Sequence, residues 1–318
     1  MNGQQQKMMN EYISRINTVI DYIDQHISQD MTLDELASVA GFSKFHFHRI
    51  FYSFMKETLF QFIQRIRLQK GADRLCMNRD VSITQIAYDC GFSSSAAFSR
   101  SFKAFFNQTP SQYRSEKGNW CVQNSNMNQG DGNQWKEKIP KIPYNEGILN
   151  EKGKMNMSDY STQVTVRNLE EMTLAYVRYI GPYAGNEDLF KNLFDRLYSW
   201  AGPRGLADDP NAKCLIIYHD NPEITEEEKL RVSVCLSVPA DTPVDGEIGK
   251  MTIPAGKYAM ARYELTSEEY GKAWDWVYSQ WLPQSGYEPD DRPCFEWYPE
   301  AEKDGKVIVD ICVPVKPM

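Results

Sequence analysis

The feature that most constrains the fold of this 318-residue chain is the tripeptide Gly-Phe-Ser, which occurs as Gly41-Phe42-Ser43 and as Gly91-Phe92-Ser93. Each copy follows a short helix pattern that has an alanine, Ala37 or Ala87, four residues before the glycine. A small residue lets a second helix cross close to the backbone, and a glycine ends a helix at positive φ at little cost. Each copy therefore predicts a helix, a sharp turn and a second helix.

The two copies align over a long stretch. Leu36 pairs with Ile86 at a separation of fifty before the turn, and Arg49 pairs with Arg100 at a separation of fifty-one after it. The second copy therefore has one extra residue behind its turn. In both second helices the apolar residues recur at helical spacing and should share one buried face. The predicted buried residues are Phe47, Ile50, Phe51 and Phe54 in the first copy and Phe98, Phe102 and Phe105 in the second.

The opposite faces of these second helices place Arg49 and Arg100 at their centres. Such a helix fits the major groove of DNA, where arginine binds guanine or a phosphate. A single helix-turn-helix is also a common packing corner with solvated arginines, but two copies in register argue against that alternative. Two units in one chain can read successive major grooves, about 34 Å apart, without a dimer.

The same stretch resembles a known family. Carriers of the resemblance include Leu33 to Ala37, Gly41 to His46, Ile86 to Phe92 and Phe98 to Lys103. Together with Thr109 to Arg114, they make residues 10 to 114 similar to the DNA-binding domain of AraC/XylS-type transcription regulators. The resemblance implies base-facing positions in both second helices. The DNA-binding residues that we predict are Lys44, Phe45, His48, Arg49 and Tyr52 in the first unit and Ser95, Ala96, Ala97, Arg100 and Lys103 in the second.

Two of these positions, Ala96 and Ala97, are often larger or polar in such proteins. An alanine can touch a thymine methyl group but donates no side-chain hydrogen bond. The second unit is therefore expected to read fewer bases than the first.

The charge of the chain is divided unevenly. The formal net charge is −8, but in residues 1–118 Lys and Arg exceed Asp and Glu by three, whereas in residues 160–318 the acidic residues exceed the basic ones by eleven. The basic part is the one with the helix-turn-helix units. Because its excess is small, DNA affinity should come from placed phosphate contacts and weaken with salt.

Several classes of protein are excluded by composition. No apolar run approaches the ~20 residues that span a bilayer, and the N-terminus lacks the apolar core of a signal peptide. The seven cysteines form no Cys-x-x-Cys pair, which argues against a disulfide framework and a zinc site. His46 and His48 diverge by about 200° on a helix and cannot share a metal. We expect a cytoplasmic protein with no metal, no cofactor and no membrane contact.

We predict two domains joined by a linker: an all-α double helix-turn-helix domain of AraC type over residues 8–118, a polar linker over 119–159 and an α+β domain over 160–318. Helices are expected at 186–202 and 267–285. Strands are expected at 163–166, 173–179, 214–218, 231–238, 249–253, 258–263, 294–298 and 307–313.

The second domain also repeats internally. Cys214 pairs with Cys294 and Tyr218 with Tyr298 at a separation of eighty, and Ala175 to Tyr179 resembles Ala259 to Tyr263 at a separation of eighty-four. This repeat predicts two β-α-β-β units about a pseudo-twofold axis. A cleft between the two halves is the natural ligand site.

The repeat is broken at one informative position, where Ile216 corresponds to Glu296. A carboxylate that is buried without a partner is costly, so a cationic ligand could supply the counter-charge, and aromatic faces would add cation-π attraction. In the alternative, the strand is an edge and Glu296 is solvated or paired to Arg178 or Arg262.

A second resemblance rests on the turn from Arg178 to Tyr183, the turn from Gly286 to Pro289 and the Phe295-Glu296 strand. Residues 160–318 are similar to the GyrI-like effector-binding domain of multidrug-sensing regulators. That resemblance implies that Glu296 lies in the pocket and neutralises lipophilic cations. The ligand-binding residues that we predict are Glu296, Tyr298, Trp276, Tyr258, Trp297 and Tyr218, with Trp274 and Trp281 as further pocket candidates.

The sequence thus predicts a one-component transcription regulator and not an enzyme. Its expected partners are double-stranded promoter DNA, a small lipophilic or cationic effector and RNA polymerase. Because the predicted linker is long, ligand should act through altered domain docking or polymerase contact rather than a rigid lever. Two alternatives for the second domain are a small-molecule hydrolase, with Glu296 activating water, and a protein-interaction module.

Overall fold

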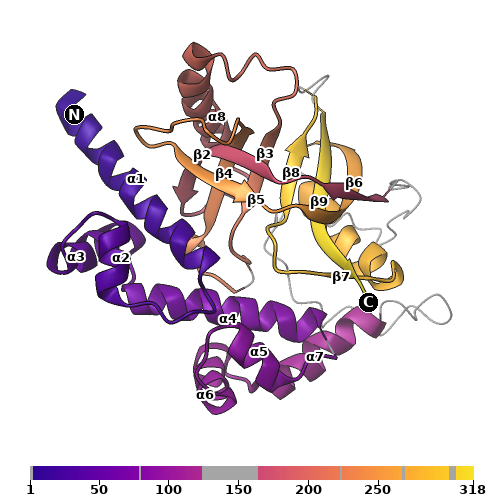
Figure 1. The fold of residues 1–318 in the computed structure, drawn as a ribbon. Helices are drawn as coiled ribbons and strands as arrows, with labels where there is room; N and C mark the ends of the chain where they lie inside the picture. The colour runs from indigo at the N-terminus through magenta and orange to yellow at the C-terminus, as the bar shows by residue number, and fades with distance from the viewer. Residues whose placement is uncertain (1–2, 79, 124–163, 223, 267–268, 301–305) are drawn as a thin grey trace.

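The computed structural model describes residues 3–78, 80–123, 164–222, 224–266, 269–300 and 306–318. An all-helical part comes first in the chain, and a sheet with two helices of its own comes second (Figure 1). The helical part consists of α1 (Gly3–Gln25), α2 (Leu33–Val39), α3 (Lys44–Met55), α4 (Leu59–Met77), α5 (Ile83–Asp89), α6 (Ser95–Phe106) and α7 (Pro110–Gln123).

The two predicted helix-turn-helix units are α2 with α3 and α5 with α6. Gly41 and Gly91 stand in their turns at φ of 64° and 80°, which confirms the predicted left-handed glycines. The starts of α2 and α5 are fifty residues apart and those of α3 and α6 fifty-one, so the extra residue lies in the second turn. Gly91 has a further reason to be glycine, because a Cβ there would lie 2.6 Å from the carbonyl oxygen of Ile27.

Each unit packs its phenylalanines into its own core. Phe47 and Phe51 are fully buried, and Phe51 meets Phe62 of α4 with ring centroids 5.5 Å apart. In the second unit the prediction for Phe105 was wrong, since its side chain is 41% exposed. Phe106, the next residue, packs against Phe102 instead, because a spacing of four residues suits the last turn of α6 as well as a spacing of three does.

The predicted linker begins later than expected. Helix α7 continues to Gln123, so the first five residues of the interval 119–159 are helical. The rest of that interval lies outside the described residues.

The strands form one curled antiparallel sheet, in which their order differs from their order in the sequence (Figure 1). The order is β1-β6-β9-β8-β3-β4-β2-β5, and β7 pairs with β9. The strands are β1 (Val164–Leu169), β2 (Met172–Ile180), β3 (Cys214–Tyr218), β4 (Arg231–Ser237), β5 (Gly249–Ile253), β6 (Gly256–Leu265), β7 (Tyr287–Pro289), β8 (Phe295–Tyr298) and β9 (Val307–Pro317).

Two helices cover one face of this sheet. Helix α8 (Glu187–Ala201) packs over the half with β2, β3 and β4, and α9 (Tyr270–Trp276) packs over the half with β6 and β9. The helix predicted at 267–285 is divided: α9 is followed by a π-helical turn at Val277–Trp281 and a 3-10 turn at Leu282–Gln284. Two further 3-10 turns lie at Gly202–Arg204 and Glu227–Lys229.

The strand order agrees with the internal repeat. Strands β2, β3 and β4 of the first half correspond to β6, β8 and β9 of the second, and the halves meet where β3 pairs with β8 at the centre of the sheet. Equivalent side chains make equivalent contacts: the Tyr198 hydroxyl interacts with the Cys214 thiol, and Tyr278 with Cys294. The sheet therefore has the two pseudo-twofold-related units that the sequence predicts.

Within the ranges that the structure covers, none of the helices combines the length and the apolar character needed to cross a membrane.

Candidate functional site

Glu296 lies in β8, between β3 and β9, at the middle of the sheet. Only 1% of this residue is exposed. Its carboxylate accepts three hydrogen bonds: from the Trp274 indole nitrogen at 2.7 Å, from the Tyr298 hydroxyl at 2.7 Å and from the Tyr218 hydroxyl at 2.9 Å. We refer to Glu296, Tyr218, Trp274 and Tyr298 as the Glu296 cluster.

The donors of this cluster carry no charge. Burial raises the pKa of Glu296, and the hydrogen bonds from Trp274, Tyr298 and Tyr218 offset only part of that increase. Burial, together with the neighbouring carboxylate, holds the pKa of Tyr298 well above its usual value. The carboxylate is thus satisfied in hydrogen bonds but has no counter-charge in the cluster.

Aromatic rings surround the same carboxylate. Trp274 stacks on Tyr278 with centroids 6.1 Å apart and meets the edge of Tyr218 at 6.4 Å. Tyr218 in turn contacts Tyr183 at 5.5 Å. The cluster therefore joins side chains from both halves of the sheet, which is where the repeat predicted a ligand site.

The edge-strand alternative for Glu296 is wrong, because β8 is paired on both sides. The two arginines considered as partners are engaged elsewhere. Arg178 donates to Asp21 of α1 at 2.7 Å, and Arg262 donates to Asp310 at 2.7 Å. The polar partners of Glu296 among the described residues are the three ring donors.

The structure brings together only some of the predicted ligand residues. Glu296, Tyr218 and Tyr298 meet in the cluster, and Trp274, a further candidate, supplies the third donor. Trp276 and Trp281 are half-buried in the core between α9 and the sheet. The useful signal for Trp274 is its spacing of four residues from Tyr278, which puts both rings on one helix face.

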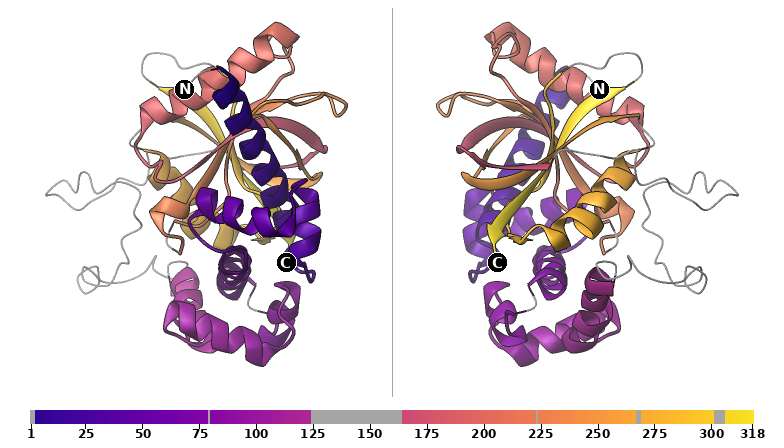
Figure 2. Two further views of the ribbon diagram at one scale, coloured as in Figure 1. Left: turned by 90° about the vertical axis from the view of Figure 1, so that its left-hand side faces the viewer. Right: turned by 90° about the vertical axis from the view of Figure 1, so that its right-hand side faces the viewer.

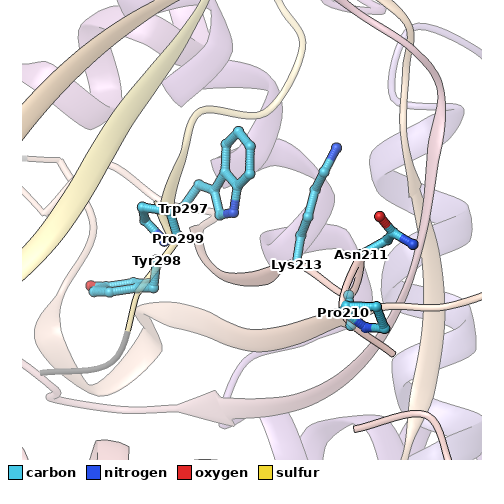
Figure 3. A pocket seen from close by; sticks show the side chains of 7 residues that line it. Pro210, Asn211, Lys213, Trp297, Tyr298 and Pro299 are labelled. Carbon is cyan, nitrogen blue, oxygen red and sulfur yellow. The ribbon is translucent and has the colours of Figure 1, made fainter. Parts of the chain in front are cut away.

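Tyr258 and Trp297 lie on the other face of the sheet. The Tyr258 hydroxyl donates to the carbonyl oxygen of Pro254 at 3.1 Å. Trp297 lines a surface pocket of about 450 Å³, where the Lys213 ammonium is 5.0 Å from its ring centroid (Figure 3). A cation thus already occupies the indole face in this pocket. Its lining residues are Pro210, Asn211, Ala212, Lys213, Trp297, Tyr298 and Pro299.

The helix that carries Trp274 is irregular. Regular α-helix ends at Trp276, two residues after the cluster donor, and the π-helical turn follows. Single π-helical turns are rare in proteins, and those that occur are often found at functional sites.

The two helices that we predict to read DNA lie at the periphery of the helical part, away from the sheet (Figure 1). On α3, His48, Arg49 and Tyr52 are exposed. Lys44 lies 3.4 Å from Asp34, and the side chain of Phe45 is outside the described residues.

On α6, Ala96, Arg100 and Lys103 are exposed, while Ser95 and Ala97 are half-buried. The hydroxyl of Ser94 caps the helix by accepting from the amide of Ala97 at 3.1 Å. Ser95 therefore starts the helix, and Arg100 stands one and a half turns along it.

No group of three or more His, Cys, Asp or Glu side chains suited to a metal ion occurs in the described part of the chain. His46 and His48 are both exposed on α3.

Comparisons with known proteins match the helical part and the sheet part of this chain separately. Residues 162–316 match the GyrI-like small molecule binding domain, and residues 36–116 match a helix-turn-helix domain. A DNA gyrase inhibitor of Edwardsiella piscicida is 32% identical over 159 residues, which are 48% of this chain and 98% of that protein.

The N-terminal part has separate relatives. A helix-turn-helix-type transcriptional regulator of Staphylococcus aureus (strain COL) is 36% identical over 112 residues, which are 35% of this chain but only 15% of that protein. A solved AraC-type transcriptional regulator from Chromobacterium violaceum is 25% identical with a TM-score of 0.31, covering 32% of this chain and 91% of that one.

Proposed function

We propose, since this chain belongs to the GyrI-like family and carries an AraC-type helix-turn-helix domain, that it regulates transcription in response to a lipophilic cation that binds at Glu296. The AraC-type domain makes the chain a DNA-binding regulator, and the GyrI-like domain binds small molecules. The class of ligand and the residues that bind it are the new part of the proposal.

The observation that carries the proposal is the missing counter-charge at Glu296. The residue is 1% exposed and is held by two phenol hydroxyls and one indole nitrogen. A buried ionised carboxylate is normally paired with a cation, because hydrogen bonds alone repay only part of its lost hydration. A cationic ligand would supply what the protein leaves out.

The surroundings of the carboxylate favour a ligand with apolar surface around its charge. Trp274, Tyr218 and Tyr278 present aromatic faces and edges beside Glu296. Such rings attract a cation and at the same time bury its apolar groups. Because Trp274 contacts the carboxylate directly, its indole must leave Glu296 when the ligand binds. The irregular helix after Trp276 supports that movement.

Calorimetric titration with tetraphenylphosphonium tests the ligand class. We expect binding to the full chain and at least about tenfold weaker binding to Glu296→Gln, which corresponds to the loss of one favourable ion pair. Glu264→Gln is the matched control, because Glu264 is 63% exposed and pairs only loosely with Lys306 at 3.9 Å. Equal affinity of Glu296→Gln, or equal binding of uncharged triphenylphosphine oxide, would contradict the proposal.

The DNA-binding role is tested by selecting duplexes from a random pool with the full chain. We expect a site with two half-sites about one helical turn apart, because two reading helices lie in one chain. We also propose RNA polymerase as a further partner and the cytoplasm, where promoter DNA is found, as the location of the protein.

Enzymatic activity is not part of the proposal, since the comparisons point to a transcription regulator. A general base must lie within hydrogen-bond reach of a substrate proton. The carboxylate of Glu296 instead accepts hydrogen bonds from three neutral side chains of the protein. Turnover of a bound electrophile that is lost in Glu296→Gln would reverse this assignment.

Inhibition of DNA gyrase is the second candidate function. It is favoured by the relative from Edwardsiella piscicida, because 98% of that gyrase inhibitor aligns with this chain. A supercoiling assay with purified gyrase and the full chain tests it. Loss of supercoiling at micromolar protein would support a protein-binding role for the C-terminal domain.

A further inference from the structure

The two strands that carry the Glu296 cluster run directly into loops that hold α4. Tyr218 is the last residue of β3, and Asp220 follows two residues later. Glu296 stands in β8, and Asp291 precedes it by five residues. Because β3 and β8 are antiparallel and Ile217 pairs with Phe295, both loops leave the sheet at the same end.

Acidic residues in these loops form ion pairs with arginines on one face of α4. Arg65 donates to Asp220 at 3.2 Å, and Arg74 donates to Asp291 at 2.9 Å. Figure 1 shows α4 lying along this end of the sheet, below β7. Further contacts on the same face are Gln69 with Thr225 at 2.9 Å, Asp73 with Asn221 at 3.3 Å and Asn78 with Glu288 at 2.8 Å.

The contact between Arg65 and Asp220 is deeply buried. The side chain of Asp220 is fully covered and that of Arg65 is 5% exposed. Asp220 also accepts from Arg231 of β4 at 2.8 Å, and Arg231 reaches Asp24 of α1 at 2.8 Å. Charges in such a network tolerate little displacement, because each one depends on its partners.

Helix α4 joins the two reading units and packs on both. Its Phe62 meets Phe51 of α3. At Gly71 it touches α6 so closely that a Cβ would lie 2.8 Å from the ring of Phe98. The position of α4 therefore sets how α3 and α6 lie relative to each other, and two reading helices must match the groove spacing of DNA together.

We propose that the Glu296 cluster controls DNA binding through α4, with the Tyr218 to Asp220 segment and the Asp291 loop as the two connections. This inference rests on the proposed function. When a ligand takes the place of Trp274 at Glu296 and Tyr218 adjusts to it, the ends of β3 and β8 shift. Asp220 and Asp291 then change their contacts with Arg65 and Arg74. The ligand thereby alters the disposition of the two reading helices rather than the helices themselves.

The first experiment measures the ratio of operator affinities with and without saturating tetraphenylphosphonium, using the selected duplex. Asp291→Asn weakens the grip on α4 at a site where Asp291 is 38% exposed, so the variant should fold. We expect a wild-type ratio of about fivefold or more, and less than half that ratio in Asp291→Asn, with unchanged affinity for tetraphenylphosphonium. Glu264→Gln should keep the wild-type ratio.

The outcomes separate the two proposals. If tetraphenylphosphonium does not bind the wild type, the proposed function fails. If it binds and changes the operator affinity, but Asp291→Asn keeps the full wild-type ratio, the route through α4 is overturned and the sensing role stands.

A second measurement needs no ligand. Hydrogen exchange of the backbone amides of α4 should be faster in Glu296→Gln than in the wild type, and faster also in Tyr218→Phe, which keeps the ring and removes one donor. Exchange in α2, which packs on α1 and α3, serves as the internal reference. Unchanged exchange of α4 in both variants would overturn the inference.

Discussion

Ile216 of β3 lies directly opposite Glu296 of β8, and the same two residues are equivalent in the internal repeat. Equivalent residues face each other only where a twofold axis passes between them, so this pair marks the pseudo-twofold axis of the sheet. Ile216 is 5% exposed and packs into the α8 half, whereas Glu296 carries the polar cluster. The two halves thus differ in chemistry at the position where the pseudo-twofold axis passes between them.

The raised pKa of Glu296 predicts a pH-dependent stability. A carboxyl whose folded pKa lies above its ordinary value of 4.5 contributes stability that is present below 4.5 and is lost as the pH rises through the folded pKa. Glu296→Gln has no such loss. The difference in free energy of unfolding between the two proteins should therefore move in favour of Glu296→Gln as the pH rises from about 4.5 toward neutrality.

Urea denaturation at several pH values measures this difference. Glu264→Gln is again the control, because it removes an exposed carboxyl from the same sheet. A difference between wild type and Glu296→Gln that is constant with pH would show that Glu296 titrates normally.

The hydroxyl of Tyr298 should stabilise the fold through its bond to Glu296. That bond is 2.7 Å long, and its acceptor is a carboxylate. We expect Tyr298→Phe to lower the free energy of unfolding at pH 7 by about 1.5–3 kcal/mol, as for a hydrogen bond to a charged group. In the background of Glu296→Gln, where the acceptor is neutral, the same substitution should cost about 1 kcal/mol.

The double-mutant cycle formed by these two substitutions gives the coupling directly. Additive effects of Tyr298→Phe and Glu296→Gln would contradict the assigned hydrogen bond.

Much of the helical part could be predicted because its signals are local. The glycine turns, the register of the two units and the one-residue offset were all present in the sequence pattern, since they depend on neighbouring residues. Phe105 and Phe106 show the limit of this approach. Both fit a helical period, and only the packing of Phe102 against the last turn decides between them.

The contacts between the two domains could not be predicted in this way. Asp24 and Arg65 fall on helices where charged residues normally indicate a solvated face, and their partners Arg231 and Asp220 follow more than 150 positions later. The long linker in the sequence argued against rigid coupling. The structure instead places α1 and α4 directly against the sheet, as the side views also show (Figure 2).

Arg231 should be one of the most important single side chains for the stability of the fold. It is 1% exposed, and although burial opposes its charge, Asp220 and Asp24 raise its pKa above the usual value. Arg231→Met leaves the fully covered Asp220 with one partner fewer. We expect a loss of about 3–5 kcal/mol in the free energy of unfolding, as for a broken buried ion pair.

Arg204→Met is the matched control, because Arg204 pairs with Asp245 at the surface, where Asp245 is 67% exposed. Its cost should be about 0–1 kcal/mol. Guanidinium denaturation of both variants distinguishes them, and similar losses would mean that the buried network adds nothing beyond a surface pair.

Lys56 ends α3 in the left-handed region at φ of 56°, and Asn107, fifty-one residues later, ends α6 at the same angle. Asparagine tolerates this conformation better than lysine does. Lys56→Asn should therefore raise the free energy of unfolding by about 1 kcal/mol or less, while Asn107→Lys should lower it by a similar amount. Thermal melts should therefore show changes in stability of opposite sign in the two variants. A loss of stability in both would show that the hydrogen bond from the Lys56 ammonium to the Ser53 carbonyl, at 2.8 Å, outweighs the backbone preference.

The two reading helices should contribute unequally to DNA recognition. Arg49 is exposed beside His48 and Tyr52, whereas Arg100 is exposed beside alanines. We expect Arg49→Ala to lose about 1–3 kcal/mol of operator affinity and to relax specificity at its position, and Arg100→Ala to weaken all duplexes alike while lowering the salt slope by about 1. Fluorescence anisotropy with the selected duplex and a scrambled one, at two salt concentrations, measures both effects. Arg167 is an exposed arginine on β1, and Arg167→Ala should leave the affinity for both duplexes unchanged at both salt concentrations. Full affinity of the Arg49→Ala, Arg100→Ala double variant would rule out α3 and α6 as the reading helices.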